Sequence, residues 1–584
     1  MDTFTNVTHI IRGATNPRIM ITNLKIGIAI LITLLQGCAG SSNDASVVVS
    51  DQLTPIQQQA VAMPDSYAAD VAMAVLNDGG NAIDAAIAAQ FSLAVTLPEA
   101  GNIGGGGFMV VHYNGQQDFL DYRETAPIKA ARDMYLDENG DVRPLDSIFG
   151  ILASGTPGTV SGMWEAHKKY GSLPWSRLLS PAIQLAQDGF IVHSQLAEQI
   201  QDYQAYLDQN KVDVNFANYF ASASANSLFK QPELANTLRH IRDNGWAGFY
   251  TDEVADTIVR FMQQHGGLIS HQDLQAYQAV WRAPIISDWR DYQVVSAAPP
   301  SSGGIAISQW LNMYDLVTQS LPKYANNSPE YTHLLAEIGK RVFADRAEYL
   351  GDPDFYEVPV SALLAKDYLN KRASHVNLKS ISETISIRPG LQESEQTTHF
   401  SIVDRDGNAV SNTTTINLGF GSGMVVEGAG FLLNDEMDDF SVKPGVPNYF
   451  GAVGGIANQI QPQKRMLSSM TPTLLLQNNQ IKMVTGSPGG TTIISSVYLS
   501  ILNAIEFGLS AQQSVDNPRF HHQLLPENQI RHHSGFPTQS IKALSLLGYD
   551  LTQDDFGDLH VIINNDGQLE AASQSSGRGK AMVE

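Results

Sequence analysis

The chain has 584 residues, 43% of them hydrophobic and 16% charged, which is typical of a large globular protein and excludes wholesale disorder. A formal net charge of -23 argues against a nucleic-acid partner, because binding to phosphates needs clustered Lys and Arg. Cys38 is the single cysteine, so an intrachain disulfide cannot form.

The N-terminal segment has the pattern of a secretory signal. An apolar run follows Lys25 and ends near Leu35, which is too short for a comfortable membrane span. We therefore predict a signal peptide over residues 1–37. Met20 is a better start than Met1, because the charged and apolar parts then have ordinary lengths.

The residues around Cys38 favour a lipid anchor. Leu35-Gln36-Gly37-Cys38 resembles a bacterial lipobox, whose cysteine is lipidated, although Gln36 is unusual there. Residues 38–54 would form a polar tether, and Ala39 is compatible with sorting to the outer membrane. We expect a bacterial periplasmic protein that is lipid-anchored to the outer membrane; the alternative is an ordinary secretory signal and a soluble periplasmic product.

Periodicity and turn residues predict alternating helices and strands. The expected elements are, in chain order, helices at 67–76 and 82–97, a hairpin of strands 108–112 and 118–122, mainly helices over 150–280, a strand over 291–297, helices after Gly303 and over 330–350, strands from 397, a helix near 491–508 and short strands to the end. Residues 376–396 are polar and predict a long loop. Because no other linker is visible, we predict an α+β or layered α/β architecture folded as one unit.

A second hairpin is predicted where the polar loop ends. Two alternating β-type runs flank Asp406-Gly407, a strong turn signal. A two-residue loop would place Thr397 opposite Ile416, and a three-residue loop with a glycine bulge would place it opposite Asn417. In either register Thr415 and Asn417 lie beside Thr397.

Thr397 begins this hairpin directly after a polar tail that ends at Gln396. A hydroxyl residue in this position suits an N-terminal nucleophile, because the α-amine freed by cleavage of the 396–397 bond can act as base for its Oγ. The activity would be latent while the chain is intact. Threonine is also a favoured strand residue, so on this stretch alone an ordinary strand start is the alternative.

Six short motifs follow one another along the chain. They are LDYRETAP (120–127), SGTPGTV (154–160), QTTHFS (396–401), NDEMDDF (434–440), KRMLSSMTPT (464–473) and TGSPGG (485–490). Any one of them is a weak signal. Together, in order and spacing from about residue 55 to the C-terminus, they resemble the γ-glutamyltransferases (glutathione hydrolases).

The resemblance implies an N-terminal nucleophile hydrolase fold of class α+β, in which two stacked β-sheets lie between helical layers. It also implies self-cleavage between Gln396 and Thr397. The products would be a large subunit, residues 55–396, and a small subunit, residues 397–584, which stay together as one intertwined heterodimer.

The resemblance further implies roles at the site. Thr397 would attack the γ-glutamyl carbonyl of glutathione or a related compound, and the acyl group would then pass to an amino acid, a peptide or water. Thr415 would bond to Thr397 and tune it. The N–H groups of Gly489 and Gly490 would form an oxyanion hole.

The donor would be held by its free amino-acid end. Arg123 would bind the α-carboxylate bidentately, helped by the hydroxyls of Ser468 and Ser469. Three residues would hold the α-ammonium: Asn417, Glu436 and Asp439. Such a pocket selects a γ-linked glutamate, because the amide to be cut then lies on the side chain.

A lid is implied over residues 441–455. Phe450 stands where many members of the family carry a tyrosine that can hydrogen-bond, a departure that bears on the lid and on the balance between hydrolysis and transfer. The histidine pairs 521–522 and 532–533 lack metal-ligand spacing, and the glycines 104–107 lack a full nucleotide-binding pattern. We therefore expect no metal and no cofactor.

Two other functions remain open. One is a related acylase of the same fold, acting on cephalosporins, glutaryl compounds or poly-γ-glutamate. The other is a non-catalytic envelope lipoprotein that binds γ-glutamyl compounds. The ammonium-binding set at Asn417, Glu436 and Asp439 favours free amino-acid ends and argues against the acylases.

Overall fold

The computed structural model describes residues 56–143, 145–387, 397–443 and 455–584. The predicted signal peptide and tether, Cys38, Gln396 and Phe450 lie outside the described residues. Of the helices in the described part, none has the length and apolar character needed to cross a membrane.

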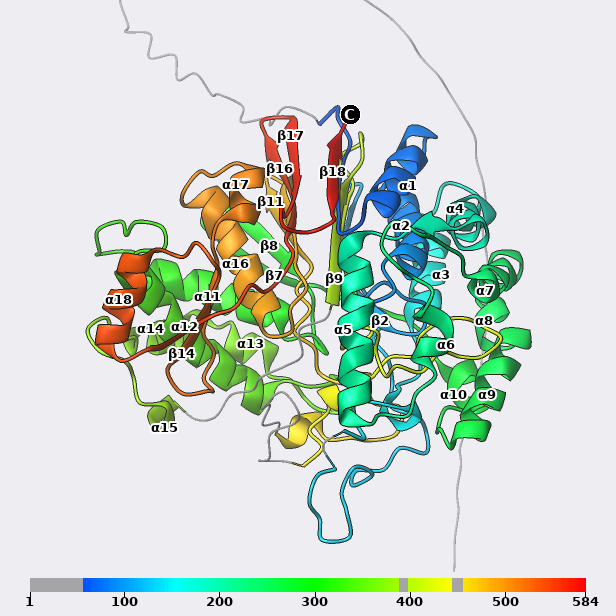
Figure 1. Ribbon diagram of the computed structural model, residues 1–584. Coiled ribbons are helices and arrows are strands. Elements are labelled where there is room, and N and C mark those ends of the chain that lie inside the picture. The colour runs from blue at the N-terminus through cyan, green and yellow to red at the C-terminus, as the bar shows by residue number, and fades with distance from the viewer. Residues whose placement is uncertain (1–55, 144, 388–396, 444–454) are drawn as a thin grey trace, which may run out of the picture. The chain divides into compact units, whose positions relative to one another are not determined.

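Two antiparallel β-sheets are stacked at the centre of the unit formed by residues 53–584 (Figure 1). The strand order of the seven-stranded sheet is β18 (Lys580–Val583), β1 (Ala60–Met63), β9 (Thr397–Val403), β10 (Ala409–Thr415), β2 (Gly106–Tyr113), β3 (Gln116–Asp121), β6 (Val280–Arg282). That of the six-stranded sheet is β17 (Gln568–Ser573), β16 (His560–Asn565), β12 (Gln480–Thr485), β11 (Thr473–Gln477), β8 (Tyr292–Ser296), β7 (Ile285–Trp289). The facing surfaces are partly polar: the Ser401 hydroxyl of β9 donates to the carbonyl of His560 in β16 at 2.9 Å.

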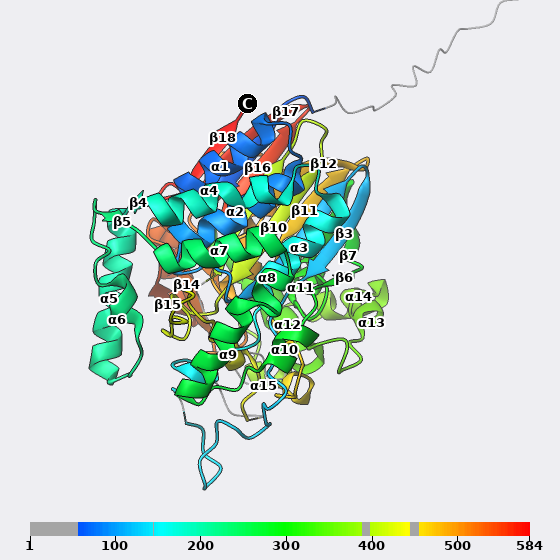
Figure 2. The same ribbon diagram turned by 90° about the vertical axis from the view of Figure 1, so that its right-hand side faces the viewer.

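Helices cover the outer face of each sheet (Figures 1 and 2). Those on the seven-stranded sheet include α1 (Ser66–Asn77), α2 (Ala82–Thr96) and α3 (Thr159–Tyr170). Those on the six-stranded sheet include α11 (Gly303–Thr318), α16 (Thr492–Ile505) and α17 (Ala511–Asp516). The longer helices of the outer regions are α4 (Trp175–Asp188), α5 (Ser194–Asn210), α7 (Pro232–Asn244), α9 (Glu253–His265), α12 (Pro329–Tyr349), α14 (Lys366–Ser374) and α18 (Thr538–Leu547).

Helix α2 shows how the sequence builds the layer behind β9 and β10. The Asn81 side chain accepts hydrogen bonds from the N–H groups of Ile83 and Asp84, and the Asp84 carboxylate accepts one from the N–H of Asn81, so the helix starts with a capping box. Every residue of the helix is buried, and its many alanines let the two strands approach closely.

Both sheets mix strands from the two sides of the predicted cleavage point. In the seven-stranded sheet β1 lies between β18 and β9, and β10 pairs with β2. In the six-stranded sheet β8 pairs with β11. The predicted layered α+β architecture is therefore confirmed, and the shared sheets explain why no domain linker is visible in the sequence.

The predicted helices and strands quoted with both ends lie within three residues of the observed ones, but three expectations were wrong. The described residues between β10 and β11 contain no strand, only the 3-10 helices η2 (Glu436–Asp439) and η3 (Ile456–Asn458). Glycines with positive φ at 421, 423, 428 and 430 favour turns there. Helices α17 and α18 occupy a region predicted as short strands, and the short helix α15 (Thr384–Ile387) lies in the predicted long loop.

Both predicted registers of the second hairpin were also wrong. Thr397 pairs with Thr415, not with Ile416 or Asn417. The Asp404 carboxylate accepts from the N–H of Asn408 at 2.9 Å, and Gly407 has φ +79°, so the loop closes at the pair Asp404 and Asn408. The glycine bulge shifts the register in the opposite direction to the predicted shift.

Candidate functional site

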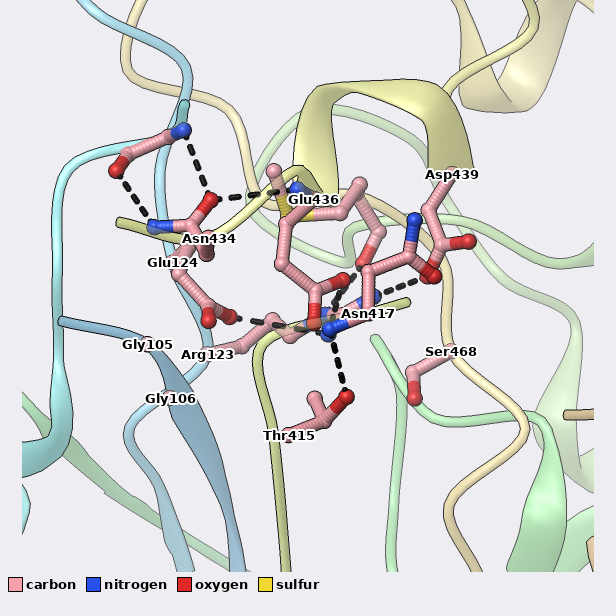
Figure 3. Close-up of polar contacts among 12 residues, drawn as sticks. Gly105, Gly106, Arg123, Glu124, Thr415, Asn417, Asn434, Glu436, Asp439 and Ser468 are labelled. Carbon is pink, nitrogen blue, oxygen red and sulfur yellow. Dashed lines mark hydrogen bonds and ion pairs between the residues drawn. The ribbon is translucent and has the colours of Figure 1, made fainter. Parts of the chain in front are cut away.

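Thr397 and Thr415 are cross-strand neighbours at the last pair of the β9–β10 ladder. Directly opposite residues of an antiparallel pair point to the same face, with Cβ atoms about 5 Å apart. Thr397 is 8% exposed, and Thr415 is buried. The Thr415 hydroxyl accepts a hydrogen bond from the N–H of Asn417 at 2.8 Å (Figure 3). The ladder therefore brings together the proposed nucleophile and two of the residues predicted beside it.

The glycine run before β2 lets the backbone pass close to this end of the hairpin. A Cβ at Gly105 would overlap the carbonyl of Thr415, and a Cβ at Gly107 would overlap that of Thr413. Asn102 adds a connection, because its amide donates to the Thr415 carbonyl at 2.9 Å. The glycines thus allow the backbone to approach a neighbouring strand closely, and this approach positions Thr415.

Arg123 lies at the centre of a buried acidic cluster (Figure 3). Its Nη1 is 2.6 Å from Glu436 Oε2 and 3.5 Å from Glu124 Oε2, and its Nη2 is ion-paired with Asp439. Burial alone would lower the pKa of Arg123, but the surrounding carboxylates raise it, so the guanidinium stays charged. Three carboxyl groups around one guanidinium provide oxygen acceptors that a bound ammonium can use.

The loop that carries Glu436 and Asp439 is held by Asn434. The Asn434 side chain accepts from the N–H of Gly155 at 2.8 Å and from the N–H of Glu436 at 3.1 Å. Its amide donates to the carbonyls of Gly104 and Gly155, both at 2.8 Å. One side chain therefore ties the acidic loop to the glycine run and to the segment before α3.

Asn417 is tied to the same loop by its own amide, which donates to the Asp435 carbonyl at 3.0 Å. Its φ of +74° is uncommon for a residue with a side chain, although asparagine tolerates it best. This backbone turn directs the chain away from β10 immediately after Thr415, so Asn417 lies between the hairpin and the acidic loop.

Ser468 and Ser469 lie just before strand β11 of the six-stranded sheet. The Ser468 hydroxyl accepts from the N–H of Met470 at 3.1 Å, and the Ser469 hydroxyl accepts from Arg346 Nη2 at 3.1 Å. Burial lowers the pKa of Arg346 to about 9, and Asp439 opposes this shift. Arg346 is thus a second buried cation beside the cluster.

Gly489 and Gly490 form the turn between β12 and α16. Their φ values are +125° and +58°, which favour glycine, and a Cβ at Gly489 would overlap the Thr492 hydroxyl. Within the described part of the chain neither N–H donates to another group. Both groups sit just before a helix N-terminus, where the helix dipole favours negative charge. The turn can therefore serve as an oxyanion hole.

Most of the predicted site residues line one small cavity of about 10 Å³, room for about one water molecule. Its lining consists of Arg123, Thr397, Thr415, Asn417, Asp439, Ser468, Ser469, Met470, Gly490 and Ile493. Glu436 and Gly489 do not line it: Glu436 is fully buried against Arg123, and Gly489 precedes the lining glycine. A glutamyl group can enter only if side chains such as that of Arg123 move.

The histidine pairs lie elsewhere, around the small sheet of β13 (Phe520–His521), β14 (Gln529–His532) and β15 (Asp550–Gln553). His521 is hydrogen-bonded to Ser495 and Gln523, and burial lowers its pKa to about 3. Among the described residues no group of three or more His, Cys, Asp or Glu side chains is arranged to hold a metal ion.

Three contributors to the cluster were missed in the sequence: Glu124, Asn434 and Arg346. Glu124 and Asn434 belong to the motifs that contain Arg123 and Glu436, and this could have marked them as site residues. Arg346 lies on α12, in no motif, and only the fold brings it to Ser469.

Glu124 leads to a prediction on pH and stability. Burial raises its pKa to about 8, so between about pH 4.5 and 8 the folded chain keeps a proton that the unfolded chain has lost. The effect of Glu124 on the free energy of unfolding is therefore most favourable below pH 4.5, and the free energy of unfolding falls as the pH rises toward 8. The Tm of Glu124→Gln minus that of the wild type should therefore increase between pH 5 and pH 9, by about 1–3 °C.

Thermal melts of both proteins across this range measure the effect. Glu138→Gln, which changes an exposed carboxylate in a surface turn, is the matched control and should show a pH-independent difference. An equally flat difference for Glu124→Gln would contradict the raised pKa.

Comparison with known proteins agrees with this geometry. The family model described as gamma-glutamyltranspeptidase matches residues 68–584. A glutathione hydrolase proenzyme from Pseudomonas aeruginosa is 51% identical over 90% of this chain and 94% of its own length, and one from Escherichia coli is 44% identical over 90% and 92%.

Solved structures give the same result. The γ-glutamyltranspeptidase from Pseudomonas nitroreducens complexed with L-DON is 50% identical, covers 56% of this chain and 97% of its own, and has a TM-score of 0.55. Cephalosporin acylase from Bacillus halodurans is 25% identical, covers 93% and 99%, and has a TM-score of 0.79. The chain belongs to the γ-glutamyltranspeptidase family.

Proposed function

We propose that this chain is a γ-glutamyltransferase and glutathione hydrolase with Thr397 as its nucleophile. The observation that carries the proposal is the single cavity at which Thr397, Arg123, Asp439 and Gly490 meet. A nucleophile, a cationic and an anionic anchor, and an N–H donor are the groups that acyl transfer from a free amino-acid end requires. The proenzyme names of the relatives support a precursor that is cleaved.

The mechanism follows from these groups. Cleavage before Thr397 frees its α-amine, which takes the proton from Oγ as Oγ attacks the γ-carbonyl. The oxyanion of the tetrahedral intermediate receives hydrogen bonds from the N–H groups of Gly489 and Gly490. The amine product leaves with a proton. An acceptor amine or water then attacks the ester, and Oγ recovers its proton. Thr415, next to Thr397 in the ladder, holds the reacting end of the strand.

Donor recognition uses both charges of the glutamyl group. Its α-carboxylate would replace Asp439 at one edge of Arg123, with Ser468 and Ser469 as further donors. The α-ammonium would then face Asp439, Glu436 and Asn417. In this arrangement Arg123 is paired with the α-carboxylate and Asp439 with the α-ammonium, so binding leaves neither charge of the ligand without a partner.

The two alternative functions are less well supported. A glutaryl acylase acts on a substrate without an α-ammonium, so Asp439 and Glu436 would have no cationic group of the substrate to bind. A non-catalytic binding protein does not need an available oxyanion hole. The identity of 44–51% to proteins named glutathione hydrolase proenzyme also favours the transferase.

A substrate series tests the proposal. The purified, cleaved enzyme should release aniline from a γ-glutamyl anilide and should cleave glutathione, and it should act at least about 10²-fold more slowly on the glutaryl anilide, which lacks the ammonium. Faster cleavage of the glutaryl or of the α-linked glutamyl compound would reject it in favour of another amidase.

The cleaved enzyme would be a heterodimer of residues 55–396 and 397–584, with amino acids or peptides as acceptors. We place it in the bacterial periplasm, anchored to the outer membrane through Cys38, on the basis of the lipobox-like run. Labelling of the wild type but not of Cys38→Ser by radioactive palmitate tests the anchor; equal labelling of both would exclude it.

A further inference from the structure

A groove lies between helix α5 and strand β9 and reaches Thr397. Its first part has a volume of about 390 Å³ and is lined by Thr397, Glu99, Gln199 and Arg578, among others. A second part of about 310 Å³ is lined by Glu99 and Gln199 as well, so the two parts lie next to each other. Helix α5 forms the outer wall and stands at the edge of the protein (Figure 2).

Thr397 lines both the groove and the small Arg123 cavity. An acyl group on its Oγ would therefore have the glutamyl part on the Arg123 side. The amine that leaves or arrives at the carbonyl would then occupy the groove, the other cavity that Thr397 lines. The groove is more than ten times larger than the Arg123 cavity, so it can hold a molecule of amino-acid or peptide size.

The first part of the groove is rich in hydrogen-bond acceptors. Glu99 is only 6% exposed; its Oε1 accepts from Arg578 Nη2 at 2.6 Å, while its Oε2 has no hydrogen-bond partner among the described residues. The same holds for Gln199 Oε1 and Asp558 Oδ1. Unsatisfied buried oxygens are uncommon and indicate a missing donor. An amino group, with several N–H donors and no competing acceptor when protonated, is the complementary ligand.

Charge leads to the same ligand. Glu99, Asp555 and Asp558 line this part of the groove, and Arg578 is the one cation among its described lining residues. Arg578 is already occupied by Glu99 and by the Thr96 carbonyl. Burial raises the pKa of Glu99 and Arg578 opposes the shift, so a cation beside Glu99 would favour its ionised form.

The second part of the groove is aromatic. Phe149, Tyr203, Tyr206 and Phe420 line it, and their rings pack on one another, with centroids 5.7 Å apart for Phe149 and Tyr206 and 5.1 Å for Tyr203 and Phe420. Aromatic rings of this kind bind apolar side chains.

We propose that the groove is the acceptor subsite: Glu99, with Gln199 and Asp558, binds the amino group of an amino acid or peptide, and the aromatic wall receives its apolar side chain. The inference rests on the proposed function. The bound ammonium first gives one proton to the Glu99 carboxylate. The neutral nitrogen then forms the new amide bond to the γ-carbonyl as the bond to Thr397 Oγ breaks, and the second proton lost by the nitrogen passes to Oγ. The amine released from the donor occupies the same place in the first half-reaction.

The test measures partition of the acyl-enzyme between transfer and hydrolysis, per cleaved enzyme, with a γ-glutamyl anilide as donor and glycine or phenylalanine as acceptor. Glu99→Gln should lower the transfer-to-hydrolysis ratio about tenfold with both acceptors. Tyr206→Ala should lower it for phenylalanine and leave glycine much less affected. Asp256→Asn, which removes an exposed carboxylate of α9 that lines neither the groove nor the Arg123 cavity, should leave both ratios unchanged.

The outcomes separate the inference from the proposed function. If the cleaved wild type does not hydrolyse the donor, the proposed function fails. If it does, but Glu99→Gln and Tyr206→Ala behave like Asp256→Asn, the acceptor subsite is elsewhere. A parallel loss of transfer and hydrolysis in both variants would also overturn the inference, because it would assign them a structural role only. Should Glu99→Gln fail to fold, Tyr206→Ala still decides through the two acceptors.

Discussion

A Thr397→Ala chain is expected to remain in one piece and to lose γ-glutamyl transfer and hydrolysis by a factor on the order of 10⁴ or more. Without the hydroxyl there is no group to attack the preceding peptide bond, so the α-amine that serves as base is never freed. Denaturing gels and intact mass should show one band, whereas the wild type should give two unequal fragments that co-elute under native conditions because they share both sheets.

Thr397→Ser is the matched variant, since it keeps the hydroxyl in the same place of the ladder. It should still cleave itself, more slowly, and retain measurable turnover. Two results would contradict the assignment: cleavage of Thr397→Ala at the same bond, or uncut wild-type protein that turns over the donor at the full rate.

The second large effect is expected at Arg123. Arg123→Lys keeps the positive charge but loses the planar pair of donors that binds a carboxylate, and kcat/KM for a γ-glutamyl anilide should fall about 10²- to 10³-fold. Removal of the cation altogether would in addition leave Glu436 and Asp439 unpaired in the interior, a cost of about 3–5 kcal/mol in stability. The lysine variant is therefore the better probe of binding.

Three donors assign the effect to the α-carboxylate. The wild type should prefer the γ-glutamyl anilide to both 4-aminobutyryl anilide, which lacks the carboxylate, and glutaryl anilide, which lacks the ammonium. Arg123→Lys should lose most of the preference over 4-aminobutyryl anilide. Asp439→Asn should lose most of the preference over glutaryl anilide. If Arg123→Lys slowed all three donors by the same factor, Arg123 would be a structural residue and not the carboxylate anchor.

The sequence was informative where the chemistry is local. A hydroxyl residue at the first position of a strand predicted the role of Thr397 from its neighbours in the chain. The roles of Gly490 and Arg123 were implied by the family motifs that contain them. Thr397, Gly490 and Arg123 now line one cavity. The helix predicted over residues 82–97 is observed as α2, because capping and residue size act within one turn.

Other features depended on groups far apart in the chain. The register that pairs Thr397 with Thr415 follows from the side-chain hydrogen bonds of Asp404 in the turn, and a turn signal alone left it open. Arg346 reaches Ser469 only through the packing of α12 on α11, the helix that covers the six-stranded sheet.

The sequence by itself determined the family, the layered fold and the chemical groups of the site, because the motifs and the turn residues act locally. Tertiary structure alone decided which carboxylates share Arg123, how their burial raises the pKa of Glu124, and that Glu99 lines a groove that reaches Thr397. The physical reason is that desolvation and ion pairing depend on which surfaces are buried together, and the strand order that buries them joins segments hundreds of residues apart.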